Sequence, residues 1–201
     1  MFFNTAAATP VVCDAFTALT DFSVARYAGQ WYEQMHVVDP QEPSYYQCST
    51  AAYTNLTDDE TDPTIKHFDV YNSFQSKVLG IWTPRIGVHP KAYCGTDGAC
   101  YITFFGKTVT TPNLNVVETD YENYAINYWC DTDTNLVRVW IDTREAVVSD
   151  EYFNSLYAKV LDLFPNFDET TFVPRLTQGD MCSYASVDKS VADFLADYKL
   201  F

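Results

Sequence analysis

The chain carries the side chains of several kinds of reactive site, but the spacings that would assemble such a site are missing. None of the six cysteines belongs to a C-x-x-C pair, and the three histidines, His36, His67 and His89, lie far apart in the sequence, which argues against a zinc centre. The acidic segment 131–135 lacks the glycine and the closing glutamate of a calcium loop, so we expect a hairpin turn there. The sequence contains no P-loop, H-E-x-x-H or G-x-S-x-G pattern. We therefore predict no metal site and no catalytic residue.

Composition indicates one folded, acidic domain that spans residues 1–201. The chain is 47% hydrophobic and 16% aromatic, enough to build a sizeable core. Its 12 basic and 27 acidic residues give a net charge of −15, which disfavours nucleic acid as a partner. No apolar run approaches the roughly 18 residues of a transmembrane helix. Six cysteines predict secretion or another oxidising lumen, and Asn55-Leu56-Thr57 is a candidate N-glycosylation site.

The elements expected to position any site are short strands between residues 29 and 142. Turn-forming residues separate these strands, and no helical period intervenes. The expected strands are Gly29–Val38, Tyr46–Asn55, Thr64–Ser73, Lys77–Thr83, Ala99–Phe105, Leu114–Glu118, Asn123–Cys130 and Leu136–Asp142. Residues 84–95, rich in proline and glycine, are expected to form a loop. An all-β barrel or sandwich follows from this pattern.

The period changes to that of a helix after residue 148. Apolar residues from Phe153 to Phe164 predict a helix over about 149–164, with Ser149 as its N-cap. A second apolar stripe predicts a short helix within the C-terminal extension 183–201. That helix could pack on the barrel exterior, or it could dock a partner chain.

Three local motifs, in order, resemble those of the lipocalins. Gly29-Gln30-Trp31 resembles the G-x-W motif of the first lipocalin strand, and Thr119-Asp120-Tyr121 resembles the T-D-Y turn between the sixth and seventh strands. Arg144 follows the last strand, as in that family. The resemblance covers about residues 13–182 and is strongest for the group of apolipoprotein D, the bilin-binding proteins and the crustacyanins. It implies an eight-stranded antiparallel up-and-down barrel with a flanking helix, in which the arginine lies over the tryptophan.

The resemblance also implies two of three disulfides. It pairs Cys13 with Cys130 and Cys48 with Cys182, and each bridge would attach a terminal arm to the barrel. Cys94 and Cys100 depart from the group's pattern; they flank a short turn, which indicates a local bridge. Sequence alone allows fifteen pairings of six cysteines.

The function implied by the resemblance is to bind and transport one small hydrophobic ligand in the barrel. In this group, residues matching Trp140 and Tyr53 contact the ligand. Strand alternation directs Arg138 and Trp140 inward and Val137, Val139 and Ile141 toward the helix. Arg138 would pair with an internal acid, which we favour, or with a ligand carboxylate or keto group. The same parity argument adds the candidates Met35, Phe104 and Tyr128, with Trp82 at the barrel mouth.

The sequence leaves the ligand and two other functions open. A carotenoid, a bilin, a sterol or retinoid, and a fatty acid all suit an aromatic lining, and no other cofactor is required. The alternatives are an enzyme on the same fold, such as an isomerase or a carotenoid-modifying relative, and a structural subunit of a homo- or hetero-oligomeric assembly.

Overall fold

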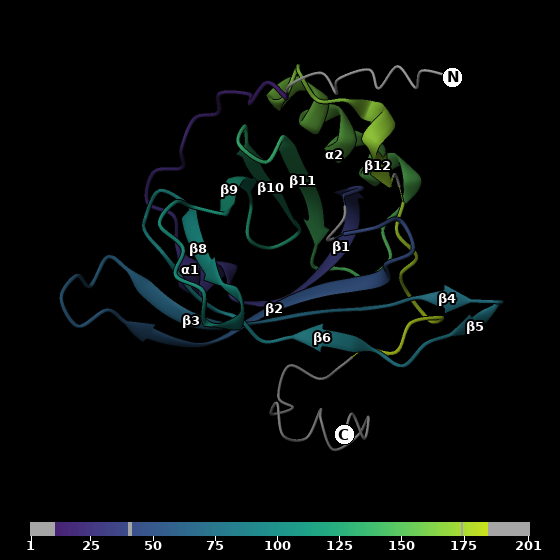
Figure 1. The fold of residues 1–201 in the computed structure, drawn as a ribbon, viewed down its shortest axis with the longest axis horizontal. Coiled ribbons are helices and arrows are strands. Elements are labelled where there is room, and N and C mark those ends of the chain that lie inside the picture. Colours follow the sequence, from purple (N-terminus) through teal and green to yellow (C-terminus); the bar gives the residue numbers. More distant parts are fainter. Residues whose placement is uncertain (1–10, 40–41, 174, 185–201) are drawn as a thin grey trace, which may run out of the picture.

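A closed antiparallel barrel of eight strands forms the body of the protein (Figure 1). The computed structural model describes residues 11–39, 42–173 and 175–184. Each barrel strand pairs with the next along the chain, and β11 pairs back with β1 to close the barrel, so the expected fold class is confirmed. The barrel strands are β1 (Gly29–Val37), β2 (Gln47–Asp58), β3 (Lys66–Gln75), a fourth strand divided into β6 (Ile86–Val88) and β7 (Lys91–Cys94), β8 (Ala99–Thr103), β9 (Leu114–Thr119), β10 (Tyr124–Asp131) and β11 (Leu136–Thr143).

The prediction of the fourth strand at 77–83 is wrong. Those residues form a separate hairpin of β4 (Lys77–Val78) and β5 (Ile81–Trp82), which projects away from the barrel in Figure 1. Its turn residues Leu79 and Gly80 both have positive φ, at 51° and 84°, as a two-residue type I′ turn requires. The expected loop at 84–95 instead supplies β6 and β7. Proline 90 lies between these two segments and has no N–H to donate, which accounts for the break in the ladder.

One long helix, α2 (Asp150–Leu163), packs on the outside of the barrel. Ser149 caps it by accepting a hydrogen bond from the Tyr152 backbone N–H, as expected from the sequence. The apolar face of α2 covers the outer faces of β1, β10 and β11 in a second core beside the barrel interior. This second core includes Val139, Ile141, Phe153, Leu156, Val160 and Phe164.

The remaining elements are short. They are α1 (Val24–Tyr27), the 3-10 turns η1 (Phe104–Gly106) and η2 (Glu169–Thr171), and β12 (Phe172–Val173), which pairs with the end of β1. The predicted C-terminal helix lies outside the described residues. No helix in the part of the chain that the structure describes is long and apolar enough to cross a membrane.

All three expected disulfides are present, and together they use every cysteine of the chain. Cys13–Cys130 and Cys48–Cys182 join residues 117 and 134 positions apart, whereas Cys94–Cys100 closes the hairpin between β7 and β8. The two long-range bridges hold the N-terminal and C-terminal arms against the barrel.

Candidate functional site

One end of the barrel is closed by the three motifs. The Arg144 guanidinium lies 3.6 Å from the centre of the Trp31 ring and donates hydrogen bonds to the carbonyls of Gln30 and Tyr121 and to those of the α1 segment. Gly29 has a φ of 100°, and a Cβ there would lie 3.3 Å from the arginine. The Asp120 side chain accepts three backbone N–H groups of its own turn. The arginine thereby joins the last strand to the first, as the family resemblance implied.

Aromatic and aliphatic side chains line the barrel above this closed end. Tyr53 is 5% exposed and packs its ring against Tyr27 and Phe68. Trp140 packs against the same interior core. The apolar members of this lining from the other strands are Val70, Ala92, Ile102, Leu114, Val116 and Ala125. The barrel interior next to the closed end is therefore lined by apolar side chains.

A bulge in β1 decides which side chains enter the barrel beyond Trp31. Glu33 pairs with Asp142 of β11, but Met35 pairs with the adjacent Ile141, so Gln34 is an extra residue. Beyond it the alternation is reversed: Met35 turns outward beneath α2, and His36 takes the inward position.

Charged side chains gather inside the barrel at the end opposite Arg144, where β1 ends and β11 begins. His36 Nδ1 is hydrogen-bonded to Glu33, and Arg138 Nε donates to Asp39 Oδ2 at 2.5 Å. The indole N–H of Trp140 donates to Glu42 Oε2 at 2.8 Å. We call Glu33, His36, Asp39, Glu42 and Arg138 the mouth cluster. Its side chains are almost buried: His36 is 1% exposed, Asp39 2%, and Glu33 and Arg138 14% each.

Burial and mutual repulsion change the protonation of this cluster. Burial, aided by the nearby Glu33 carboxylate, raises the pKa of Glu42 to about 7, against the opposing effect of His36 and Arg138. Burial alone would lower the pKa of His36, but the carboxylates of Glu33, Glu42 and Asp39 together outweigh it and raise that pKa. The cluster therefore holds protons at a pH where isolated carboxyl groups are ionised.

Two buried nitrogens of the cluster have no hydrogen-bond partner among the described residues. They are His36 Nε2 and Arg138 Nη2. Arg138 also lies with its guanidinium 4.9 Å from the Trp129 ring centre. Buried polar atoms are nearly always hydrogen-bonded in folded proteins, so these two nitrogens could each form a further hydrogen bond at this end of the barrel.

A hydrogen-bonded chain continues from the cluster toward the closed end. The Tyr27 hydroxyl donates to Asn127 Oδ1 at 3.1 Å, and Asn127 Nδ2 donates to Asp142 Oδ2 at 2.7 Å. Burial and the neighbouring Glu33 raise the pKa of Asp142 well above its usual value. Asp142 pairs with Glu33 across the β1–β11 ladder, so the two carboxyl groups face one another in the barrel.

Of the residues expected to contact the ligand, four lie at the interior and three do not. Arg138, Trp140 and Tyr53 occupy the positions just described, and Phe104 packs partly buried against the interior core. The inward expectation is wrong for Met35, because of the bulge. It is also wrong for Tyr128, which stacks on Phe164 of α2 with ring centres 4.4 Å apart. Trp82 lies on the projecting hairpin with Lys77 5.5 Å from its ring centre, outside the barrel sheet.

Sequence reasoning missed most of the mouth cluster. Glu33 shares parity with Trp31, and Asp142 shares parity with Trp140, so alternation could have found both. His36 depends on the bulge, which has no sequence signature here. Asp39 and Glu42 lie in the loop after β1 and reach back inside, which strand parity cannot indicate.

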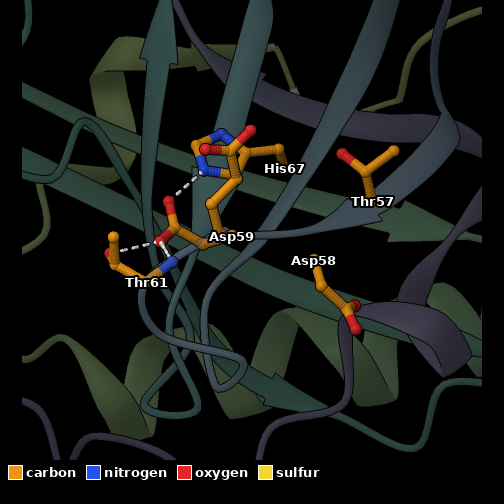
Figure 2. Close-up of a pocket in the computed structure, with 6 residues that line it drawn as sticks. Thr57, Asp58, Asp59, Thr61 and His67 are labelled. Atoms are coloured by element: carbon orange, nitrogen blue, oxygen red, sulfur yellow. Dashed lines mark hydrogen bonds and ion pairs between the residues drawn. The ribbon is translucent and has the colours of Figure 1, made fainter.

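A hollow lies at the exposed tip of the β2–β3 hairpin (Figure 2). Figure 2 shows Asp59 hydrogen-bonded to Thr61 and to His67. Hydrogen bonds from Thr61, His67 and the turn backbone hold the pKa of Asp59 well below its usual value. No group of three or more metal-ligating side chains occurs within the described ranges, and the turn is a self-satisfied loop. Nearby Asn55 is exposed and donates to Asp69 at 2.9 Å.

Comparison with known proteins agrees with this architecture. No family model matches the chain. Insecticyanin-A and insecticyanin-B of Manduca sexta are each 27% identical to it over 184 residues, which is 88% of this chain and 92% and 84% of theirs. The solved structure of insecticyanin from the tobacco hornworm Manduca sexta has a TM-score of 0.63 at 24% identity, covering 86% of this chain and 89% of its own. Lobster apocrustacyanin A1 has a TM-score of 0.55 at 22% identity, covering 83% and 92%. The closed barrel and its similarity to these solved structures show that the chain has the lipocalin fold.

Proposed function

We propose that this chain is a lipocalin that carries one small hydrophobic ligand inside its barrel, in an extracellular or other oxidising compartment. The observation that supports the proposal is a barrel interior with two chemically different halves. Aromatic and aliphatic side chains around Tyr53 suit an apolar body, and the mouth cluster offers a polar end two buried nitrogens that have no partner among the described residues. A carotenoid, a bilin, a sterol or retinoid, and a fatty acid all have this two-part form.

The disulfides argue against one form of the enzyme alternative, an isomerase with a thiol in the cavity. An isomerase that uses a thiol in the cavity needs a free cysteine. All six cysteines of this chain are in disulfides, so no thiol is available. The same disulfides support an oxidising compartment.

Titration of the oxidised chain with a panel of ligands tests the carrier function. Retinol, biliverdin, palmitic acid, cholesterol and a carotenoid are added separately, and quenching of tryptophan fluorescence is followed. We expect at least one of them to saturate at one molecule per chain. If none saturates, the carrier function is refuted.

A matched pair of variants tests whether the ligand lies inside the barrel. Tyr53→Leu removes an inward ring, whereas Tyr93→Leu removes a ring that stacks on Tyr101 on the outer face. We expect the first variant to weaken binding several-fold and the second to leave it unchanged. Equal effects would contradict binding in the interior, and circular dichroism of both variants checks that each is folded.

A further inference from the structure

The polar end of the barrel presents donors rather than acceptors to a ligand. His36 Nε2 and Arg138 Nη2 are buried and lack partners among the described residues. The contact with Glu33 favours the protonated imidazole, because it raises the pKa of His36, and in that form Nε2 carries a proton. A guanidinium N–H is always a donor. A ligand group that satisfies both must therefore accept hydrogen bonds, which excludes an ammonium group.

The same region already contains an excess of acidic groups. Four acidic side chains face only two basic ones there: the acids are Glu33, Asp39, Glu42 and Asp142, and the bases are Arg138 and His36. The barrel relieves the repulsion by retaining protons on Glu42 and Asp142, whose pKa values are both raised. A ligand carboxylate would add a further negative charge at low dielectric and would lose its hydration as well. Arg138 cannot offset this fully, because its Nε is already bound to Asp39.

From these two observations we propose that the mouth cluster selects an uncharged ligand that ends in a hydrogen-bond acceptor, such as a keto, aldehyde, ester or hydroxyl oxygen, over the same ligand ending in a carboxylate. The inference rests on the carrier function proposed above and narrows its ligand class. It favours neutral oxygenated polyenes or sterols over fatty acids and over bilins with free propionates.

Ligands that differ only in their end group test this selectivity. Retinal, methyl retinoate and retinoic acid share one polyene, and each is titrated against the oxidised chain at pH 7.5 by tryptophan quenching. We expect the aldehyde and the ester to bind at least about tenfold more tightly than the acid. If retinoids do not bind, palmitic acid or biliverdin is compared with its methyl ester. Equal affinities, or tighter binding of the acid, would overturn the selectivity.

A charge-matched pair of variants connects the selectivity to the cluster. Glu42→Gln removes one internal carboxyl group and keeps an oxygen that can accept from Trp140. Glu60→Gln removes the same charge from the exposed β2–β3 tip. We expect the ratio of ester to acid affinity to fall several-fold in E42Q and to stay unchanged in E60Q. A ratio that is unchanged in both would overturn the role of the cluster. Absence of binding by every ligand refutes the carrier function, whereas equal binding of acid and ester refutes the selectivity alone.

Discussion

Replacing Glu42 with glutamine should make the protein more stable at neutral pH and alter it far less at acid pH. The pKa of Glu42 is raised from 4.5 to about 7 in the folded chain by burial and by Glu33. The folded protein therefore holds a proton that the unfolded chain releases, so stability falls as the pH rises from about 4.5 to about 7. Glutamine does not titrate, so the variant does not lose stability in this way as the pH rises.

The size of the effect follows from the pKa shift. Each pKa unit corresponds to 1.36 kcal/mol, so the full shift is worth ~3 kcal/mol. The Glu42 residue is only partly buried, and allowance for water reduces the figure to about 2 kcal/mol.

Urea unfolding at pH 5.0 and pH 7.5, followed by tryptophan fluorescence with the disulfides intact, measures this difference. The free energy of unfolding of E42Q minus that of the wild type should be more positive at pH 7.5 than at pH 5.0, by about 2 kcal/mol. Glu60→Gln, at the exposed hairpin tip, should show no such change between the two pH values. A difference for E42Q that is constant with pH, or that becomes more negative at pH 7.5, would refute the raised pKa of Glu42.

Three further predictions concern the barrel and its bridges. Arg144→Ala should lower the free energy of unfolding by about 2–4 kcal/mol, because it removes the contact with Trp31 and five hydrogen bonds to carbonyls. Arg144→Lys should recover only part of this loss. Equal stability of the two variants in urea unfolding would contradict a role for the guanidinium contacts. Replacing both Cys48 and Cys182 with serine should lower the free energy of unfolding by ~5 kcal/mol, against ~2 kcal/mol for serine at both Cys94 and Cys100. The difference arises because the first bridge closes a far longer loop. Thermal unfolding compares the two variants, and the reverse order of stability would argue against loop entropy as the cause. Trp140→Phe should cost about 1–2 kcal/mol through the lost hydrogen bond to Glu42. In the Glu42→Leu background, which has no acceptor to leave unpaired, the same substitution should cost less, and an equal cost in both backgrounds would count against that bond.

Alternation and local motifs were enough to predict most of the barrel. The G-x-W and T-D-Y motifs and Arg144 lie where the resemblance implied, because each is a short contiguous pattern with one local geometry. The apolar stripe from Phe153 to Phe164 gave α2 to within a residue or so at each end. Such features depend on neighbours in sequence, which a single chain displays directly.

The errors arose where tertiary contacts override local pattern. Residues 77–83 have strand-forming side chains, yet the Leu79-Gly80 turn folds them into a hairpin of their own. Residues 86–94 contain glycine and proline but gain enough pairing from β3 and β8 to form the fourth barrel strand.

The candidate site was harder to predict than the barrel. Arg138 and Trp140 were found because β11 alternates without interruption, whereas the acids that contact them arrive from a loop nearly a hundred residues earlier in the chain. Tyr128 was misassigned because its neighbour, the polar Asn127, occupies the inward position and is satisfied there by Asp142. Only the folded register shows that a polar residue can be the inward one.

The bulge at Gln34 makes the chemistry of the barrel interior depend on the length of β1 rather than on the identity of a lining residue. The extra residue is fixed from outside, since the Gln34 side chain donates to Thr143 and to the Ala146 carbonyl, and its own carbonyl accepts from Leu176. Deletion of Gln34 would restore simple alternation, so that the Met35 side chain would point into the barrel and the His36 side chain would lie beneath α2. An insertion or deletion of one residue in β1 would thus exchange a polar for an apolar side chain at the inward position in a single step.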